Sequence, residues 1–355
     1  MTTQNIAFAF VPYTLHFKEP GMTSRGILKH KLTYLLKGWI KENPKIVAYG
    51  EVPIFPGLSK ESPDELEAAL KELCITGDYR AVLENHNFSS LRFGIEQVLH
   101  SLANDNNIIF PSAFTSGNAW ITINGLVWMG AFHKMKKRVI EKLEDGFECI
   151  KIKIAAINWE EELELIRFIR DTYGYGVIIR VDANGGFSPQ ECLLKLEELS
   201  KYEIHSIEQP IKPGSYPEMR KICSESPIPV ALDEDLIGIG PGDIRSEILS
   251  YILPEYIILK PALCYGFTGA SDWIKRAKKM NISFWITSAL ESSVGLNAIA
   301  QFTGTLNPEI PQGLGTGHLF VNNFESPLVL DRENLNYIPE TVSYESELEK
   351  LKWRN

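Results

Sequence analysis

The sequence predicts an α/β protein built on a TIM-like (β/α)7β barrel, with a smaller α+β domain before it and a short segment after it. From about residue 120, short apolar runs alternate with helical patterns, which is typical of a parallel sheet. The repeat is close to the roughly 31 residues per unit of an eight-strand barrel. A doubly wound open sheet fits less well, because no glycine-rich dinucleotide turn follows the first strand. Single cores stop growing near roughly 250–300 residues, so the length of 355 residues by itself suggests one large domain or two of moderate size.

Residues 1–115 are predicted to form the α+β domain. We expect an antiparallel meander from segments that are rich in Val, Ile, Tyr and Phe and separated by Gly, Pro and Asn, at 4–17, 26–38 and 45–54. Two helices should follow these strands. Ser62 with Glu65 three positions later is a capping-box pattern, and residues 91–102 repeat apolar side chains at helical spacing.

Residues 116–320 are predicted to form the barrel. Its strands are expected at seven short apolar runs, namely 120–125, 148–155, 176–183, 204–210, 228–234, 256–262 and 283–290. A final strand near 312–316 would close the barrel. After residue 320 the repeat is lost, so we expect residues 321–355 to return to the first domain and complete it.

Composition and charge exclude several classes of protein. The 45 acidic and 36 basic side chains give a net charge of −9, which argues against a nucleic-acid partner but leaves an anionic small molecule open. No apolar run reaches the roughly 18 residues of a membrane span. The five cysteines are scattered without a C-x-x-C pair, and the N-terminus has no secretory pattern. We therefore expect a cytoplasmic protein with reduced cysteines, and the sequence leaves open whether it is a monomer or a homo-oligomer.

Charged residues recur at the carboxyl ends of five successive predicted strands. They are Lys153, Asp182, Glu208, Asp233 and Lys260, separated by 29, 26, 25 and 27 residues. In a parallel barrel these strand ends form one mouth, which is where barrel enzymes carry their active sites. Each residue taken alone could belong to a turn, a helix cap or the surface. Their common interval favours one shared site.

The types of residue at these positions indicate a chemistry. Three carboxylates without a His or Cys partner are hard oxygen ligands, which favour Mg²⁺, and Mn²⁺ could substitute for it. Lys151 and Lys153 lie two apart on one strand and share a face. An isolated pair of this kind is more typical of a solvent-facing strand, but a strand of a parallel sheet is normally covered. Paired lysines lower each other's pKa, and a neutral lysine can act as a base. A divalent cation opposite such lysines can stabilise an enediolate, formed when a proton α to a carboxylate is removed.

These motifs resemble the enolase superfamily, and specifically its muconate-lactonising subgroup. The matching stretches are K-I-K at 151–153, VDANG around Asp182, IEQP around Glu208, LDE around Asp233, and the opposing Lys260. The N-terminal region is similar to the capping domain of that superfamily. The resemblance implies that Asp182, Glu208 and Asp233 hold the metal, with Asn184 and Glu234 supporting them. It also implies that Lys153 is the base, that Lys151 tunes Lys153, and that Lys260 stabilises the enediolate from the far face.

Within the superfamily, the chain resembles the o-succinylbenzoate synthase family of menaquinone biosynthesis. TSALESSVGLNAIAQF at 287–302 is similar to its seventh-strand segment, and QGLGTGHLF at 312–320 is similar to its eighth-strand loop. The implied reaction dehydrates 2-succinyl-6-hydroxy-2,4-cyclohexadiene-1-carboxylate to o-succinylbenzoate. The implied substrate contacts are Arg180, Ser288, the backbone amides near Gly313 and Gly315, and Thr23, Ser24 and Arg25 in the loop at 18–26.

Other activities of the same superfamily compete with this interpretation. Dipeptide epimerases carry a D-x-D near strand eight that pairs with an ammonium group, whereas this chain has GLGTG there. The mandelate-racemase type needs a histidine at strand seven, and TSALES has none. N-acylamino-acid racemase and muconate cycloisomerase remain open. Asp235 stands where the family commonly has a serine, which blurs the choice of metal ligand. A barrel that only binds its ligand is disfavoured, because all five reactive positions keep usable groups.

Overall fold

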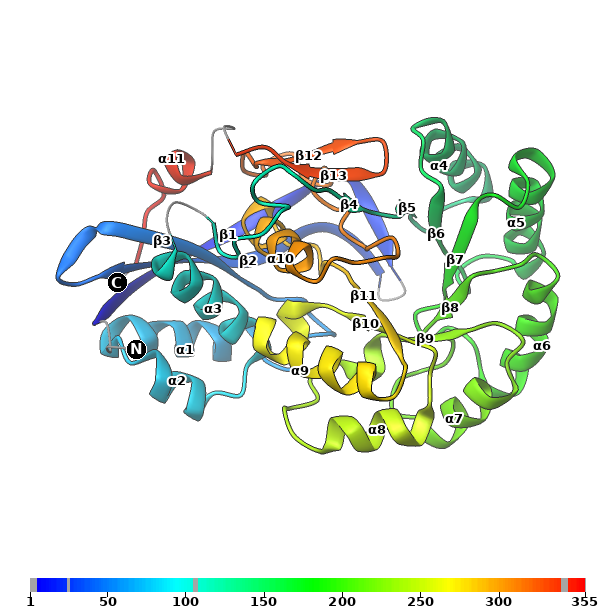
Figure 1. Cartoon of the computed structure of the whole chain (residues 1–355), viewed down its shortest axis with the longest axis horizontal. Coiled ribbons are helices and arrows are strands. Elements are labelled where there is room, and N and C mark those ends of the chain that lie inside the picture. The colour runs from blue at the N-terminus through cyan, green and yellow to red at the C-terminus, as the bar shows by residue number, and fades with distance from the viewer. Residues whose placement is uncertain (1–4, 24–25, 105–107, 340–343, 355) are drawn as a thin grey trace.

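A computed structural model describes residues 5–23, 26–104, 108–339 and 344–354. The chain begins with an antiparallel sheet in the order β1-β2-β3, made of β1 (Ile6–Thr23), β2 (Gly26–Ile40) and β3 (Asn43–Pro53). The meander expected from the sequence is present in this sheet. Figure 1 shows the following helices on one face of the sheet, namely α1 (Pro63–Thr76), α2 (Tyr79–Asn85) and α3 (Ser89–Ala103).

The capping box predicted at Ser62 begins α1. The Ser62 hydroxyl accepts a hydrogen bond from the Glu65 amide, and the Glu65 carboxylate accepts one from the Ser62 amide at 2.8 Å. Helix α3 packs closely on β3 because two glycines face each other. A Cβ on Gly50 would lie 2.6 Å from the carbonyl oxygen of Gly94, so a larger residue there would push the helix away.

Seven parallel strands form the second sheet, in the order β11-β10-β9-β8-β7-β6-β5. They are β5 (Gly125–Val127), β6 (Cys149–Lys153), β7 (Ile178–Asp182), β8 (Ser206–Glu208), β9 (Val230–Leu232), β10 (Tyr256–Leu259) and β11 (Ser283–Ile286). Each strand is followed by a helix, and these are α4 (Phe132–Glu144), α5 (Trp159–Tyr173), α6 (Pro189–Ser200), α7 (Tyr216–Glu225), α8 (Ile244–Ile252), α9 (Gly266–Lys279) and α10 (Ser293–Thr305). Short 3₁₀ turns η1 (Glu234–Leu236) and η2 (Pro261–Leu263) follow β9 and β10. The alternation predicted from the repeat is confirmed.

The segment at Gln312 and Gly313 joins the two edges of this sheet. The Gly313 amide donates to the Ile286 carbonyl at 2.8 Å, next to the parallel bridge between Thr287 and Gly313. On the other side, the Asn124 amide, next to β5, donates to the Gln312 carbonyl at 2.9 Å, and the Gln312 amide donates to the Thr122 carbonyl at 2.8 Å. The predicted closing strand is therefore present, although its bridges involve only the first two residues of the expected range 312–316.

The first barrel strand begins later than the sequence predicted. Ile121 and Thr122 form β4, whose ladder partner is a strand of the tail, whereas the parallel sheet itself starts with β5 at Gly125. The tail strands are β12 (Leu328–Asp331) and β13 (Asn334–Tyr337), and the sheet order is β12-β13-β4. The alternating apolar pattern of 120–125 suits either sheet, so only the position of the tail decides which one it joins.

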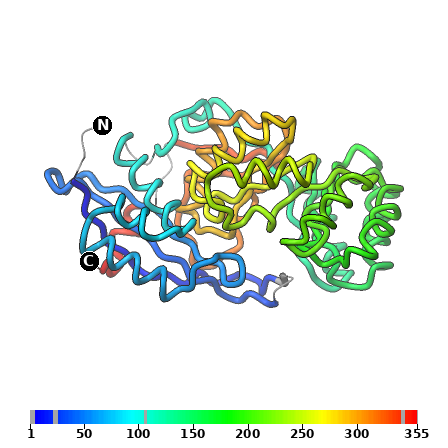
Figure 2. Tube along the Cα trace, turned by 90° about the horizontal axis from the view of Figure 1, so that it is seen from below, coloured from blue at the N-terminus to red at the C-terminus, as the bar shows by residue number. Residues whose placement is uncertain are grey.

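The tail then reaches the N-terminal sheet. After α11 (Glu345–Leu348), the Arg354 amide donates to the Phe10 carbonyl at 2.9 Å. Tyr344 and Leu348 pack with Tyr49 of β3 in one apolar cluster. Figure 2 shows this red segment against the blue strands, with the green helices of the barrel at the other end of the molecule. In the described part of the chain, no helix is both long enough and apolar enough to cross a membrane.

Candidate active site

A cavity of about 900 Å³, open to solvent, lies at the carboxyl ends of the barrel strands. Lys151, Lys153 and Glu208 line it from the barrel, and Phe55 and Leu58 line it from the segment that follows β3. The cavity therefore lies between the barrel mouth and the N-terminal region. A pocket with apolar walls and a few convergent charged groups has the character of a small-molecule site.

Strand register brings the predicted charged residues together. Lys153 of β6 pairs in register with Asp182 of β7, which pairs in register with Glu208 of β8. Neighbouring residues in register point to the same face of a sheet, so the three side chains lie side by side. Asp233 and Lys260 directly follow β9 and β10 and add to the same cluster. The convergence expected from the spacing is thus present.

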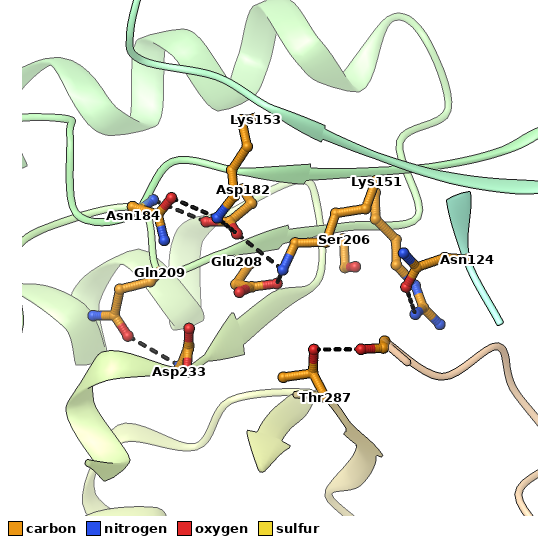
Figure 3. Close-up of polar contacts among 12 residues, drawn as sticks. Asn124, Lys151, Lys153, Asp182, Asn184, Ser206, Glu208, Gln209, Asp233 and Thr287 are labelled. Carbon is orange, nitrogen blue, oxygen red and sulfur yellow. Dashed lines mark hydrogen bonds and ion pairs between the residues drawn. The ribbon is translucent and has the colours of Figure 1, made fainter. Parts of the chain in front are cut away.

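Each lysine of the cluster contacts a carboxylate. Figure 3 shows Lys151 and Lys153 pointing toward Asp182 and Glu208. The Lys151 Nζ lies 2.9 Å from Asp182 Oδ2 and also contacts Glu208 Oε2. The Lys153 Nζ lies 2.5 Å from the same Asp182 oxygen. The Lys260 Nζ contacts Asp233 Oδ2. The two lysines of β6 therefore share Asp182, and Lys260 is held separately across the mouth.

Burial and neighbouring charges move the pKa values of this cluster in different directions. Burial favours the neutral form of Asp182, but Lys151 and Lys153 outweigh it and hold the Asp182 pKa below its usual range. Burial, followed by the charge of Asp182, raises the pKa of Glu208 well above its usual value. Burial also lowers the pKa of Lys151, but Asp182 and Glu208 outweigh it, so this pKa lies above its ordinary value. The carboxylates, and not the neighbouring lysine, therefore set the direction of the Lys151 pKa.

The donor set fits a divalent cation. Buried carboxylates outnumber the lysines in the cluster by one, since Asp182, Glu208, Asp233 and Glu234 face Lys151, Lys153 and Lys260. The Oδ1 atom of Asp233 is buried without a hydrogen-bond partner. An excess of buried carboxylate oxygen is what a hard cation such as Mg²⁺ neutralises. Among the described residues, no three acidic, His or Cys side chains lie close enough together to hold an ion. The Lys151 ammonium lies between the carboxylates of Asp182 and Glu208.

Asn184 connects Lys153, on one side of the site, to Glu234, on the other. Its side-chain oxygen accepts from the Lys153 Nζ at 2.6 Å, and its side-chain nitrogen donates to Glu234 Oε1 at 3.1 Å. Its backbone amide also donates to Asp182 Oδ1 at 3.0 Å. Asn184 therefore links Lys153, Asp182 and Glu234, and the supporting role expected of Asn184 and Glu234 stays a prediction.

Sequence reasoning missed Gln209, which orients the Asp233 loop. Its side-chain oxygen accepts from the Asp233 amide at 3.0 Å, and its side-chain nitrogen donates to Asp235 Oδ2 at 2.8 Å. Asp235 also accepts from the Gly214 amide at 2.7 Å and does not line the cavity. Both carboxylate oxygens of Asp235 are thus engaged in holding the loop, whereas Asp233 Oδ1 has no hydrogen-bond partner. The buried amide next to Glu208 in the IEQP motif was the signal that could have pointed to Gln209.

Arg180 does not line the cavity, which corrects the expected substrate contact. Its guanidinium lies 4.1 Å from the centre of the Trp285 ring, and its Nη1 donates to the Pro311 carbonyl at 2.7 Å. Arg180 is two residues before Asp182 on β7, so both share a face, but Arg180 is one layer deeper in the barrel. Arg180 therefore belongs to the buried interior of the barrel beneath the site.

Some of the substrate contacts expected in the last two strand segments lie at the cavity, and others do not. Ser288, Gly313 and Gly315 line the cavity, and the Ser288 hydroxyl lies 2.6 Å from that of Thr316. The Gly313 amide is bonded to the Ile286 carbonyl by barrel closure, so the expectation that it receives a substrate carboxylate is wrong. Ser24, Arg25 and the Thr23 side chain lie outside the described residues.

The apolar wall of the cavity was also missed. Besides Phe55 and Leu58 it includes Leu126, Trp128 and Trp285. Leu126 and Trp128 come at the end of the first barrel strand, which the sequence placed too early, so the wall could not be assigned from it. Trp285 lies on β11 of the barrel. Phe55 and Leu58 reach the cavity only through packing of the N-terminal region on the barrel.

Comparison with known proteins agrees with this fold. Residues 134–335 match the family described as enolase C-terminal domain-like. The chain belongs to this family, within the enolase superfamily. It is 40% identical over 353 residues to an o-succinylbenzoate synthase of Desulfotalea psychrophila, a match that covers 89% of this chain and 95% of that protein.

Two solved structures with different names share the fold of this chain. The crystal structure of MenC from Desulfotalea psychrophila superposes with a TM-score of 0.78 and 37% identity, covering 94% of this chain and 99% of that one. A dipeptide epimerase of Cytophaga hutchinsonii, solved with Mg and the dipeptide D-Ala-L-Val, gives a TM-score of 0.81 at 22% identity, covering 98% and 99%. The epimerase likeness shows the fold alone. That epimerase was solved with Mg, so one enzyme with this fold binds a divalent metal.

Proposed function

We propose that the chain is an o-succinylbenzoate synthase, a lyase that removes water from 2-succinyl-6-hydroxy-2,4-cyclohexadiene-1-carboxylate to form o-succinylbenzoate in menaquinone biosynthesis. The observation that carries this conclusion is the 40% identity to a named o-succinylbenzoate synthase along nearly the whole of both chains. The lysine and carboxylate cluster at the barrel mouth supplies the groups that the reaction needs. Dipeptide epimerase, N-acylamino-acid racemase and muconate cycloisomerase are the less favoured alternatives.

Lys153 is the group that moves the proton. In its neutral form, its Nζ takes the proton from the carbon α to the ring carboxylate, and the C–H electron pair passes into the carboxylate to form an enediolate. When the enediolate collapses, the carbon–oxygen bond of the 6-hydroxyl group breaks. The Lys153 ammonium returns the proton to the departing hydroxide on the same face, so that water leaves and the ring becomes aromatic. The bonds of Lys153 to Asp182 and Asn184 support this role, because they fix the direction of its side chain.

Lys260 stabilises the charge that develops during the reaction. It follows β10 and lines the same cavity as Lys153. Burial lowers its pKa, but Asp233 and the other carboxylates outweigh it and raise the pKa of Lys260 above its ordinary value. A permanently charged ammonium cannot take up a proton, but it can stabilise an enediolate electrostatically. Lys151, between Asp182 and Glu208, sets the field around Lys153.

Asp182, Glu208 and Asp233 are the residues that would hold a divalent cation, which we take to be Mg²⁺ with Mn²⁺ as a substitute. When bound, such a cation supplies positive charge beside the substrate carboxylate, which acidifies the neighbouring carbon. Asn184 and Glu234 keep these carboxylates and Lys153 in a fixed arrangement. The unpartnered Oδ1 of Asp233 supports the assignment.

The N-terminal region acts as a capping domain in this proposal. We divide the chain into a capping domain at 1–115, a catalytic barrel at 116–320, and a C-terminal segment at 321–355 that completes the cap. The contribution of Phe55 and Leu58 to the cavity supports this division. Contacts from Thr23, Ser24 and Arg25, and a cytoplasmic location, stay predictions.

The test is turnover of the cyclohexadiene substrate by the purified chain, followed through the ultraviolet absorbance of the aromatic product. We expect turnover that depends on Mg²⁺, almost no turnover by Lys153→Ala, and negligible epimerisation of L-Ala-L-Glu. Lys137→Ala, on the exposed face of α4, is the matched control and should keep full activity. Full turnover by Lys153→Ala would refute the base, and efficient dipeptide epimerisation would refute the activity.

A further inference from the structure

A second buried charge cluster lies outside the active site, where the N-terminal sheet meets the barrel. It consists of Lys31 on β2, Glu51 on β3 and Glu291 in the loop that follows β11. Their exposed fractions are 5%, 0% and 0%, and none of the three lines the active-site cavity. Buried charges are costly unless each is paired, so their partners indicate what the cluster holds in place.

Glu51 caps the first turn of α10 from the other domain. Its Oε2 accepts from the Ser292 amide at 2.9 Å, the Ser292 hydroxyl at 2.5 Å and the Gly295 amide at 3.0 Å. A carboxylate at this end of a helix also meets the positive end of the helix dipole. A Cβ at position 295 would lie 2.8 Å from this oxygen, so glycine makes room for the cap. On its own sheet, Glu51 Oε1 accepts from the Thr33 hydroxyl at 2.7 Å.

The other two members hold the loop immediately before that helix. The Lys31 Nζ donates to the Leu290 carbonyl at 2.8 Å, and Glu291 Oε2 accepts from the Ala289 amide at 2.7 Å. Leu290 has φ of 62°, a left-handed conformation that a non-glycine residue adopts only when its surroundings impose it. Together, the three charged side chains bind polar backbone groups of residues 289, 290 and 292.

The loop held in this way forms one wall of the active-site cavity. Ser288, Ala289 and Leu290 all line the cavity, and Ser288 is paired there with Thr316. We infer that Lys31, Glu51 and Glu291 are positioning residues, which set the 288–290 wall from the N-terminal sheet and thereby determine how tightly the substrate is bound. This inference rests on the proposed function and adds a second role for the N-terminal domain, which would shape the cavity from behind as well as cover it.

The experiment compares Glu51→Gln and Lys31→Met with a matched control. Glu61→Gln removes another buried carboxylate, which accepts from the Ser90 amide of α3 at 3.3 Å and does not contact the 288–290 loop through any hydrogen bond given for the described residues. Misplacing a binding wall by about 1 Å can cost up to about 100-fold in activity. We expect Glu51→Gln and Lys31→Met to raise KM by about tenfold or more, with a change in kcat of under about threefold. Glu61→Gln should lower thermal stability but leave KM unchanged. Lys31→Arg keeps the positive charge, so its KM should stay close to the wild-type value.

A second measurement does not depend on turnover. Amide hydrogen exchange in the peptide covering 287–296 should become faster in Glu51→Gln than in wild type, and should stay unchanged in Glu61→Gln. The inference is overturned if KM and this exchange are the same in Glu51→Gln as in Glu61→Gln. It is also overturned if kcat falls while KM stays constant. A wild-type chain without turnover would refute the proposed function, and the exchange comparison would still decide the inference.

Discussion

Glu291 should make the stability of this protein depend on pH in an unusual direction. Burial raises its pKa from 4.5 to about 7, while Lys31 lowers it and Glu51 raises it further. These are the charged groups that face Glu291 from β2 and β3. Its Oε1 atom is buried without a hydrogen-bond partner, which agrees with a carboxyl group that prefers to be neutral. The perturbation is Glu291→Gln, which is neutral at every pH and can still accept from the Ala289 amide.

The sign and size follow from the two pKa values. In the unfolded chain the carboxyl group ionises near its ordinary value, whereas in the folded chain it keeps its proton up to about pH 7. The folded state therefore binds more protons, and the free energy of unfolding falls as the pH rises between these two values. From about pH 5 to about pH 8, the loss attributable to Glu291 is about 2–3 kcal/mol.

Urea denaturation of the wild type and of Glu291→Gln at both ends of this pH range is the assay. We expect the free energy of unfolding of the wild type to fall relative to that of the variant as the pH rises. The difference between the two proteins removes the contribution of every other titrating group. Glu141→Gln, on the surface of α4, controls for the loss of one carboxylate. A difference that is the same at both pH values would show that Glu291 ionises normally, and the reasoning from burial would be wrong.

Three further substitutions test the site and the contact between the N-terminal sheet and the barrel. Asp233→Asn should weaken the binding of Mg²⁺, measured by calorimetric titration, by more than the roughly 10-fold to 100-fold that loss of a residue supporting a ligand costs. An unchanged affinity would remove Asp233 from the ligand set. Lys260→Ala should lower kcat by about 10²–10³ with Mg²⁺ affinity retained, because it removes a charge that acts on the transition state, and normal kcat would contradict that role. Gly295→Ala places a Cβ 2.8 Å from Glu51 Oε2 and should cost about 1–3 kcal/mol in urea denaturation, whereas a wild-type midpoint would mean that Glu51 does not cap α10.

Much of the barrel could be predicted because its signals are local. Each of β6 to β11 lies within one of the predicted apolar runs, and the Ser62 capping box begins α1 as expected. The first barrel strand was placed too early, because residues 120–125 alternate in a way that suits two sheets. The tail strand β13 takes up residues 121 and 122, and that contact involves residues more than 200 positions apart.

The charged centre of the site was predictable for a similar reason, and its surroundings were not. Parallel strands in register place Lys153, Asp182 and Glu208 side by side, so their spacing along the chain was enough to group them. Arg180 shows the limit of that reasoning, since strand alternation gives the face of a residue but not its depth in the barrel. Gly313 shows another limit, because its amide is taken by a neighbouring strand.

The sequence by itself determined the order of the elements, the faces of the strands and the set of charged groups at the barrel mouth, because these depend on periodicity along the chain. The tertiary structure decided which distant segments complete the cavity and which charges hold it in place. Phe55 reaches the cavity, and Glu51 reaches Ser292 across 241 residues, only because the N-terminal sheet packs on the barrel. Contacts of this kind are set by packing and by the need to pair buried charges, and neither leaves a repeating pattern in the sequence.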